Sequence, residues 1–183
     1  MKRFQFAAIA LAASLAGAAT PALAQVMVGG APMLASKDII DNAVNSKDHT
    51  TLVAAVKAAG LVETLKGPGP FTVFAPVNAA FAALPAGTVD TLLKPENKAA
   101  LTKVLTYHVV SGKMDSTSLL KAIDAGGGRA TLTEVSGGKL TATKSGGSIM
   151  LADESGGMAN VTIADVMQSN GVIHVVDKVL LPK

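Results

Sequence analysis

Residues 67–85 read GPGPFTVFAPVNAAFAALP, and this stretch decides the fold. The Gly/Pro cluster at 67–70 interrupts any helix, and the apolar, β-prone residues that follow predict a short buried strand over 71–75. Pro76 ends the strand. Asn78 is predicted to cap a short helix that runs through Phe81 to Leu84. The stretch therefore predicts a strand that turns directly into a helix.

Helical patterns lie on both sides of this unit. Apolar residues at helical spacing predict helices near residues 36–44, 50–59 and 97–105, and Gly60 suits the position that ends the second of them. His49 stands at the start of the second helix beside charged residues, so we expect it to be solvated. Residues 107–110 read as a strand.

The second half of the chain has strand character. Glycine-rich SGG turns at 136–138, 145–147 and 155–157 separate short β-prone runs. This spacing is typical of successive β-hairpins, in which glycine supplies the positive φ that the turns require. Helices first and strands second predict an α+β fold with mostly antiparallel pairing.

The chain begins with a basic pair, an Ala-rich apolar run and the small residues of Ala22-Leu23-Ala24. This order predicts a secretory signal peptide over residues 1–24, because the apolar run is shorter than the ~20 residues that a membrane span needs. Residues 25–35 are expected to be a flexible lead-in, and residues 36–183 a single domain. Without a membrane-spanning segment after cleavage, the protein is expected in the periplasm or the medium.

Composition argues against nucleic acid as a partner. The chain has no cysteine, and removal of residues 1–24 leaves 14 Lys and Arg against 13 Asp and Glu, a net charge of +1. One Tyr and no Trp are available to stack on bases, so nucleic acid is not expected as a partner.

Three segments together resemble the fasciclin-like domain family: residues 51–85, residues 105–113 (LTYHVVSGK) and residues 170–182 (NGVIHVVDKVLLP). The residues that carry the resemblance are Phe71, Thr72, Phe74, Ala75, Pro76, Asn78, Phe81, Tyr107, His108, Asn170, Gly171 and His174. Val77 departs from the Thr that the family commonly has before the Asn. The resemblance implies a wedge in which a twisted antiparallel β-sandwich is flanked by several short helices. It also implies a non-catalytic adhesion module without a cofactor, whose partner is a protein or polysaccharide of the cell surface or matrix.

The resemblance also suggests two candidate contact sites. The first is Tyr107 with His108, and the second is Asp165 with Val166, although Ile163-Ala164 replaces the Glu-Pro of the adhesive relatives. Both pairs have a structural interpretation, which we favour. His108 would hold a strand against a loop through a hydrogen bond, with Asn78 and Asp165 as the expected partners. Asp165 would cap a turn before Asn170-Gly171.

No known catalytic motif is present, and the three histidines have no metal-binding spacing, so neither catalytic nor metal residues are predicted. Two alternatives to a recognition module stay open. A carrier of a small hydrophobic ligand would have a cavity lined by Phe71, Phe74 and Phe81. A hydrolase on the same fold would hold a titratable group with a shifted pKa in a deep pocket.

Overall fold

The computed structural model describes residues 25–183, and the predicted signal peptide lies outside the described residues. The α+β class is confirmed. The helices are α1 (Ile39–Ala43), η1 (Lys47–His49), α2 (Thr50–Ala59), α3 (Val62–Lys66), α4 (Asn78–Ala82), α5 (Thr88–Leu92), η2 (Pro95–Asn97), α6 (Lys98–Tyr107) and α7 (Ser116–Ala125). The strands are β1 (Val26–Val28), β2 (Ala31–Met33), β3 (Phe71–Pro76), β4 (Val109–Ser111), β5 (Arg129–Thr133), β6 (Lys139–Ser145), β7 (Ser148–Ala152), β8 (Met158–Gln168) and β9 (Gly171–Val176).

Seven strands form one strongly curved sheet in the order β4-β3-β9-β8-β7-β6-β5. The two edge strands approach each other, because Val110 of β4 forms an isolated bridge with Glu134 just after β5. The backbone N–H of Val135 also donates to the carbonyl of Val109 at 2.9 Å. The sheet is therefore nearly closed, and a separate core lies on each face of its central strands.

The strand predicted from residues 71–75 lies at the centre of the molecule. β3 pairs in parallel with β9, whereas the other strand pairs of the described chain are antiparallel. Both faces of β3 are covered: Val73 and Ala75 belong to one core, and Phe74 belongs to the other. A strand buried on both faces reads as a continuous apolar run, which is why residues 71–75 show no polar alternation.

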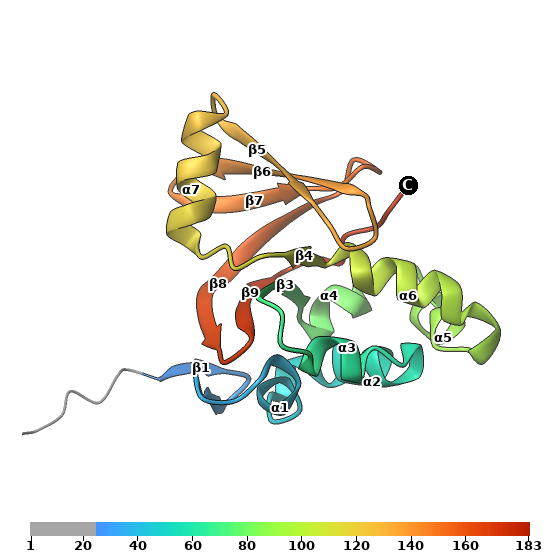
Figure 1. Ribbon diagram of the computed structural model, residues 1–183. Helices are drawn as coiled ribbons and strands as arrows, with labels where there is room; N and C mark the ends of the chain where they lie inside the picture. Colours follow the sequence, from blue (N-terminus) through green and yellow to red (C-terminus); the bar gives the residue numbers. More distant parts are fainter. Residues whose placement is uncertain (1–24) are drawn as a thin grey trace, which may run out of the picture.

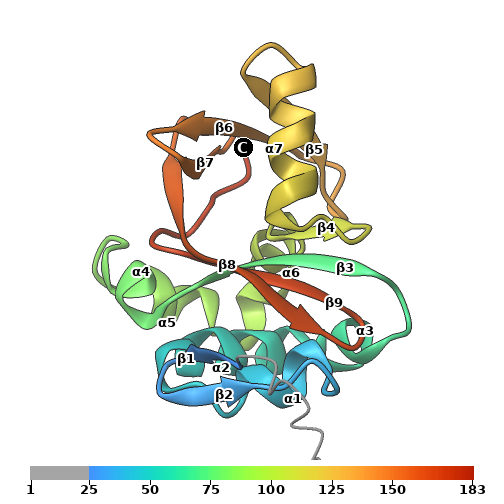
Figure 2. The ribbon, with the colours of Figure 1, turned by 90° about the vertical axis from the view of Figure 1, so that its left-hand side faces the viewer.

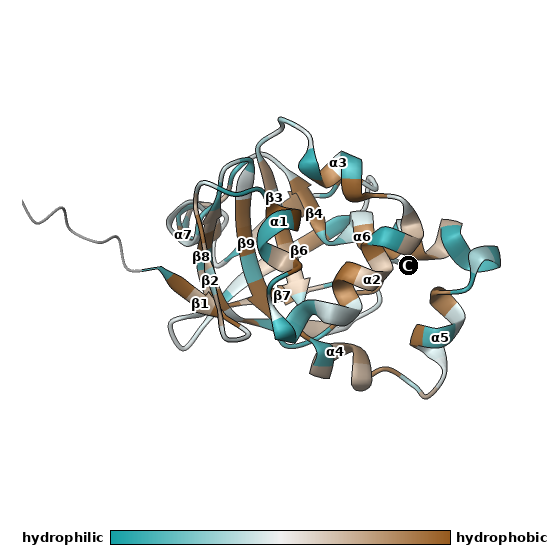
Figure 3. Cartoon of the chain, turned by 90° about the horizontal axis from the view of Figure 1, so that it is seen from below, coloured by the Kyte–Doolittle hydropathy of each residue, from teal (hydrophilic) through white to brown (hydrophobic). Residues whose placement is uncertain are grey.

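The first core lies between β3 and β9 and the helices α1, α2 and α3 (Figure 1). Figure 3 shows these helices in front of the central strands, with hydrophobic colour on the strands that they cover. The second core lies between β5, β6 and β7, the opposite face of β3 and β9, and α7, which packs along β5 and β6 (Figure 2). The long strand β8 joins the two halves.

Residues 26–33 correct one expectation. The segment predicted to be a flexible lead-in contains a two-stranded hairpin, with Val26 opposite Met33 and Val28 opposite Ala31. Its turn, Gly29-Gly30, has φ angles of 59° and 75°, which glycine adopts without steric cost. Val28, Ala31 and Met33 are buried against the first core, and this burial orders the hairpin.

Within residues 25–183, none of the helices combines the length and the apolar character needed to cross a membrane.

Candidate functional site

Tyr107 ends helix α6, and β4 begins only at Val109, so the predicted strand over 107–110 is wrong in its first two residues. The Tyr107 ring is fully buried. Its hydroxyl donates to the carbonyl of Lys139 at 2.8 Å and accepts from the N–H of Glu154 at 3.0 Å. Burial raises the pKa of this phenol to about 12. Tyr107 thus fastens helix α6 to the start of β6 and to the turn between β7 and β8.

His108 is the next residue and is 2% exposed. Its Nε2 accepts from the N–H of Leu180 at 3.0 Å, so Nδ1 carries the proton and donates to the carbonyl of Val104 at 2.8 Å. The prediction that Asn78 and Asp165 are the hydrogen-bond partners of His108 is therefore wrong. Burial lowers the pKa of His108 to about 4, and the neutral ring connects α6 to the C-terminal segment.

His174 lies on β9 and is fully buried. Its ring stacks on Phe74 of β3, with a centroid distance of 5.7 Å and an interplanar angle of 24°. Nδ1 accepts from the backbone N–H of Asp165 at 3.4 Å, and Nε2 donates to the carbonyl of Met114 at 2.8 Å. Burial lowers the pKa of this ring as well.

Asp165 lies at an irregularity of β8 and has a φ of 58°, the one positive φ of a non-glycine residue in the described chain. Its carboxylate accepts from the backbone N–H of Ser116 at 2.6 Å and from the Ser116 hydroxyl. We expected Asp165 to cap a turn before Asn170-Gly171. Its carboxylate is instead bonded to Ser116, the first residue of α7. Val166, next in the chain, is 1% exposed.

Ser116, Asp165 and His174 therefore lie together without the order of a nucleophilic triad. The Ser116 hydroxyl donates to Asp165, whereas both ring nitrogens of His174 are bonded to backbone groups. A base for nucleophilic catalysis needs a nitrogen that faces the hydroxyl. The three residues instead hold the start of α7 against β8 and β9.

The amide side chains of the motif connect elements. Asn78 does not cap its own helix. Its Oδ1 accepts from the N–H of Thr51 at 3.0 Å and from the Thr50 hydroxyl, and its Nδ2 donates to the carbonyl of Lys47 at 2.8 Å, so it caps α2. The prediction of an N-cap for α4 is therefore wrong.

Asn170 precedes β9 and joins two helices to it. Its Oδ1 accepts from the N–H of Ile39 at 3.2 Å, and its Nδ2 donates to the carbonyls of Leu65 and Gly67 at 2.7 and 3.2 Å. Gly171 follows with its α-carbon so close to β3 that an added Cβ would lie 2.1 Å from the carbonyl oxygen of Phe71.

The other motif residues are also part of the frame. Thr72 donates from its hydroxyl to the carbonyl of Gly112 at 2.7 Å and accepts from the N–H of Met114 at 2.8 Å. Ala75, Pro76 and Phe81 are buried, and Phe71 is partly buried. The structure thus brings the three sequence segments together around β3 and β9, with few of their side chains at the surface.

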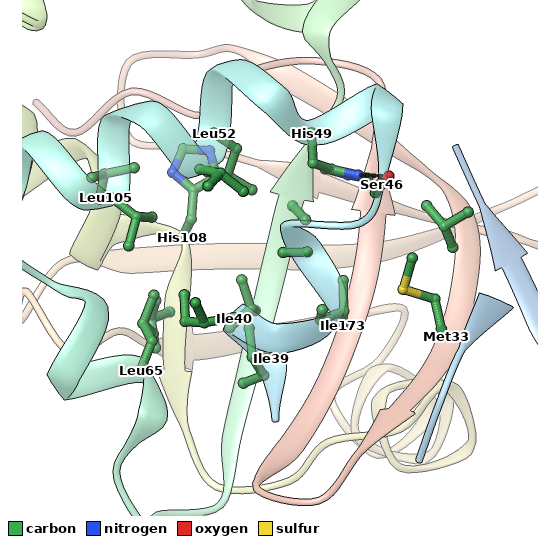
Figure 4. Close-up of a pocket in the computed structure, with 17 residues that line it drawn as sticks. Met33, Ile39, Ile40, Ser46, His49, Leu52, Leu65, Leu105, His108 and Ile173 are labelled. Carbon is green, nitrogen blue, oxygen red and sulfur yellow. Dashed lines mark hydrogen bonds between the residues drawn. The ribbon is translucent and has the colours of Figure 1, made fainter. Parts of the chain in front are cut away.

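An apolar cavity of about 40 Å³ lies between the β1–β2 hairpin, α1, α2 and the central sheet (Figure 4). Its wall is formed by Val28, Met33, Ile39, Ile40, Ala43, Ser46, His49, Leu52, Val53, Val56, Leu65, Val73, Ala75, Leu105, His108, Val109 and Ile173. None of the phenylalanines predicted for a carrier cavity takes part. Phe81 lines a second void of about 10 Å³, which Leu105 and His108 also border.

His49 is 3% exposed, so the prediction of a solvated side chain is wrong. Its Nδ1 lies 2.9 Å from the Ser46 hydroxyl, whereas its Nε2 is buried without a hydrogen-bond partner in normal geometry. Burial lowers the pKa of His49, although the nearby carbonyl of Ala75 and the carboxylate of Asp48 favour the proton. Two charged neighbours in the sequence suggested solvent, but the packing of α2 on the sheet covers the ring.

Glu134 was not singled out by the sequence analysis, and it is 4% exposed. One carboxyl oxygen, Oε1, has no partner, and the other lies 3.3 Å from the Ser136 hydroxyl. Burial, reinforced by the carboxylates of Glu154 and Asp153, raises its pKa to about 8. Among residues 25–183, no group of three or more His, Asp or Glu side chains is arranged to hold a metal ion. A Glu beside an SGG turn reads as exposed, so no sequence signal could have found it.

Comparison with known proteins places these features in a family. The model of the fasciclin domain matches residues 47–182. Protein sll1483 of Synechocystis sp. is 48% identical over 145 residues, which cover 79% of this chain and 73% of that protein. The immunogenic protein MPB70 of Mycobacterium bovis is 34% identical, over 76% of this chain and 66% of its own. The transforming growth factor-beta-induced protein ig-h3 of Sus scrofa is 35% identical, over 79% of this chain and 19% of its own.

The fold has a solved counterpart in the FAS1 domain pair of the insect cell adhesion molecule Fasciclin I. The TM-score is 0.71 at 17% sequence identity, and the match covers 79% of this chain and 51% of that one. The chain thus spans about half the length of the domain pair. The likeness confirms the predicted α+β wedge.

Proposed function

The chain belongs to the fasciclin domain family, and from this premise we propose that it is an exported, non-catalytic recognition module that binds a protein or polysaccharide partner at the cell surface or in the periplasm. Fasciclin domains are found in adhesion and extracellular matrix proteins. The solved counterpart comes from a cell adhesion molecule. Export rests on the sequence pattern of residues 1–24.

One observation carries the non-catalytic part of the proposal. The ring nitrogens of the motif histidines His108 and His174 are bonded to backbone groups, and both rings are buried. Such groups stabilise the fold and have no free hydrogen-bond donor or acceptor for a substrate. His49 faces the cavity, but its unpaired Nε2 is covered by neighbouring atoms. A hydrolase on this fold would need its titratable group to face a pocket.

The residues that the resemblance suggested as partner contacts are better suited to support a contact surface than to touch the partner. Tyr107, His108 and Val166 are at most 2% exposed, and the Asp165 carboxylate is bonded to Ser116. We assign the partner contact instead to the surface that Tyr107 supports: the turn at 134–138 and the turn at 153–157. In Figure 1 both turns lie on the side of the molecule where the chain ends.

Two exposed apolar side chains mark this surface. Val135 lies in the first turn and is 45% exposed, and Met158 follows the second turn and is 47% exposed. The carboxylate of Glu154 accepts from the N–H of Lys139 at 3.2 Å, so the two turns are held together. Exposed apolar groups on turns that hydrogen bonds hold in place suit a protein partner, because their burial stabilises a complex and the held turns lose little freedom on binding.

The test is binding of the mature chain to arrays of matrix proteins and cell-surface polysaccharides. We expect Val135→Asp and Met158→Asp to weaken saturable binding at least ~10-fold with an unchanged melting temperature. Met27→Asp and Val44→Asp are matched controls, since these side chains are 55% and 48% exposed on the hairpin and after α1. Equal loss in all four variants would reject the assigned surface. Turnover of an ester or glycoside substrate would reject a non-catalytic role.

A further inference from the structure

We propose that the cavity between the β1–β2 hairpin, α1, α2 and the sheet is a binding site for a small apolar molecule or for the methyl end of an alkyl chain. This site is separate from the surface of the two turns, and it does not depend on a macromolecular partner. Its wall comes from segments that are far apart in the sequence (Figure 4). Their convergence gives the cavity a defined shape.

The surface that faces the cavity is almost entirely apolar. Three polar side chains contribute to the wall, Ser46, His49 and His108. Both nitrogens of His108 are bonded to backbone groups, and Nδ1 of His49 is paired with Ser46. The unpaired Nε2 of His49 is covered by neighbouring atoms. A ligand in this space therefore meets hydrocarbon and gains nothing from a polar group.

The size of the cavity sets the size of the ligand. A water molecule needs roughly 10–15 Å³ of such space together with polar partners. The cavity offers about 40 Å³ without those partners, so water has room but no hydrogen bonds. Dry apolar cavities of proteins bind xenon and small hydrocarbons. Leu105 and His108 separate it from the second void and limit the length of the ligand.

The wall of the cavity is least covered between α1 and α2. Ala43 at the end of α1 and Val53 on α2 are partly exposed, whereas the other wall residues are buried. On another side Val28 and Met33 close the cavity, so the hairpin serves as part of its cover. A ligand can therefore enter between α1 and α2, and a longer chain can leave its head group in solvent there.

Xenon is the probe for the first test, with methyl NMR spectra of the mature chain recorded under increasing xenon pressure. We expect saturable shifts for the methyl groups of Leu52, Val56 and Ile173 and none for Leu140 and Leu151 of the second core. Val56→Ile reduces the space by one methylene and should weaken xenon binding at least ~10-fold. Val110→Ile is the matched control, a buried valine of the second core, and should bind as the wild type does.

A second variant keeps the test open if Val56→Ile does not fold. Val53→Phe places a larger ring at the partly exposed entrance, and we expect it to slow xenon exchange with little effect on the melting temperature. Absence of wall-specific shifts in the folded wild type would overturn the proposal. Equal shifts in the wall and in the second core would do the same, because they would indicate general partitioning.

Two ligands distinguish the source of the apolar group. Ethane represents a free apolar molecule, and hexanoate represents a chain with a head group at the entrance. Displacement of xenon by ethane alone assigns the site to whole apolar molecules. Displacement by hexanoate at lower concentration assigns it to alkyl chain ends. If neither compound displaces xenon, the proposal that the cavity binds a hydrocarbon group is overturned.

Discussion

Glu134 demonstrates how one side chain can set the alkaline limit of stability. Its carboxyl group keeps its proton up to a pH of about 8 in the folded chain, because burial and the nearby Glu154 and Asp153 raise its pKa from 4.5. The unfolded chain releases that proton near pH 4.5. Between these values the folded state binds more protons, so the free energy of unfolding falls as the pH rises.

Glu134→Gln should remove this dependence. At pH 4 the variant should match the wild type within ~1 kcal/mol, and at pH 9 it should be more stable by up to ~5 kcal/mol, since the pKa rises from 4.5 to about 8 and each pKa unit corresponds to ~1.4 kcal/mol. Urea denaturation at the two pH values measures the difference. Asp124→Asn, an exposed carboxyl on α7, serves as the control. A constant difference between variant and wild type across the range would contradict a buried, protonated Glu134.

Single residues also mark the limit of sequence reasoning. The motif residues Tyr107 and His108 were singled out for their types, and the structure gives them unforeseen partners: Lys139, Glu154, Val104 and Leu180. Those partners lie between 4 and 72 residues away. Residue type indicates that a buried polar group needs a partner, but only the folded chain selects it.

At the scale of the element, the pairing of β3 with β9 depends on Gly171. A Cβ at this position would lie 2.1 Å from the carbonyl oxygen of Phe71, its partner in the parallel ladder. Relief of that clash would require the two central strands to separate. The φ of Gly171 lies outside the positive region, so backbone conformation does not require a glycine here. The close approach of β3 does.

We therefore expect Gly171→Ala to destabilise the protein by more than ~3 kcal/mol or to prevent folding. Gly147→Ala is the comparison. Gly147 has a φ of 89° in an open turn with no atom near an added Cβ, so its substitution should cost only ~1–2 kcal/mol of backbone strain. Thermal denaturation of both variants measures the contrast. Equal losses would contradict the close approach of β3 as the reason for the glycine at position 171.

The hairpin at residues 26–33 gives a second lesson at this scale. Two glycines between short apolar runs are a hairpin signal, but the Gly, Pro and Met residues of 25–35 led to the prediction of a flexible lead-in. Burial of Val28 and Met33 against the first core supplies the free energy that orders it. An isolated two-stranded hairpin is marginal in water, so this element exists only in the context of the domain.

For the whole molecule, the three histidines set the acid limit of stability. Burial lowers the pKa of His49, His108 and His174 below 6.5, in the case of His108 to about 4. A base with a lowered pKa stays neutral in the fold while the unfolded chain takes up a proton. The free energy of unfolding therefore falls as the pH drops from 6.5 towards 4.

This loss of stability at acid pH should be measured in the Glu134→Gln background. Over part of the range, Glu134 changes the free energy of unfolding with pH in the opposite direction. We expect the variant to lose at least ~2–3 kcal/mol between pH 7 and pH 4, about the amount that His108 alone supplies. Chemical denaturation at half-unit pH steps gives the curve. A flat profile over this range would show that the three rings are not held neutral by burial.

The sequence by itself determined the α+β class, the strand at 71–75, the hairpin-rich second half and the family, because periodicity, glycine turns and motif order are local properties of the chain. The tertiary structure alone decided the parallel pairing of β3 with β9, the burial of His49 and Glu134, and the cavity beneath α1 and α2. Each of these depends on which distant segments meet. Contacts across more than a hundred residues, such as that of Asn170 with Ile39, leave no periodic trace in the sequence, because they depend on which elements pack together in the fold.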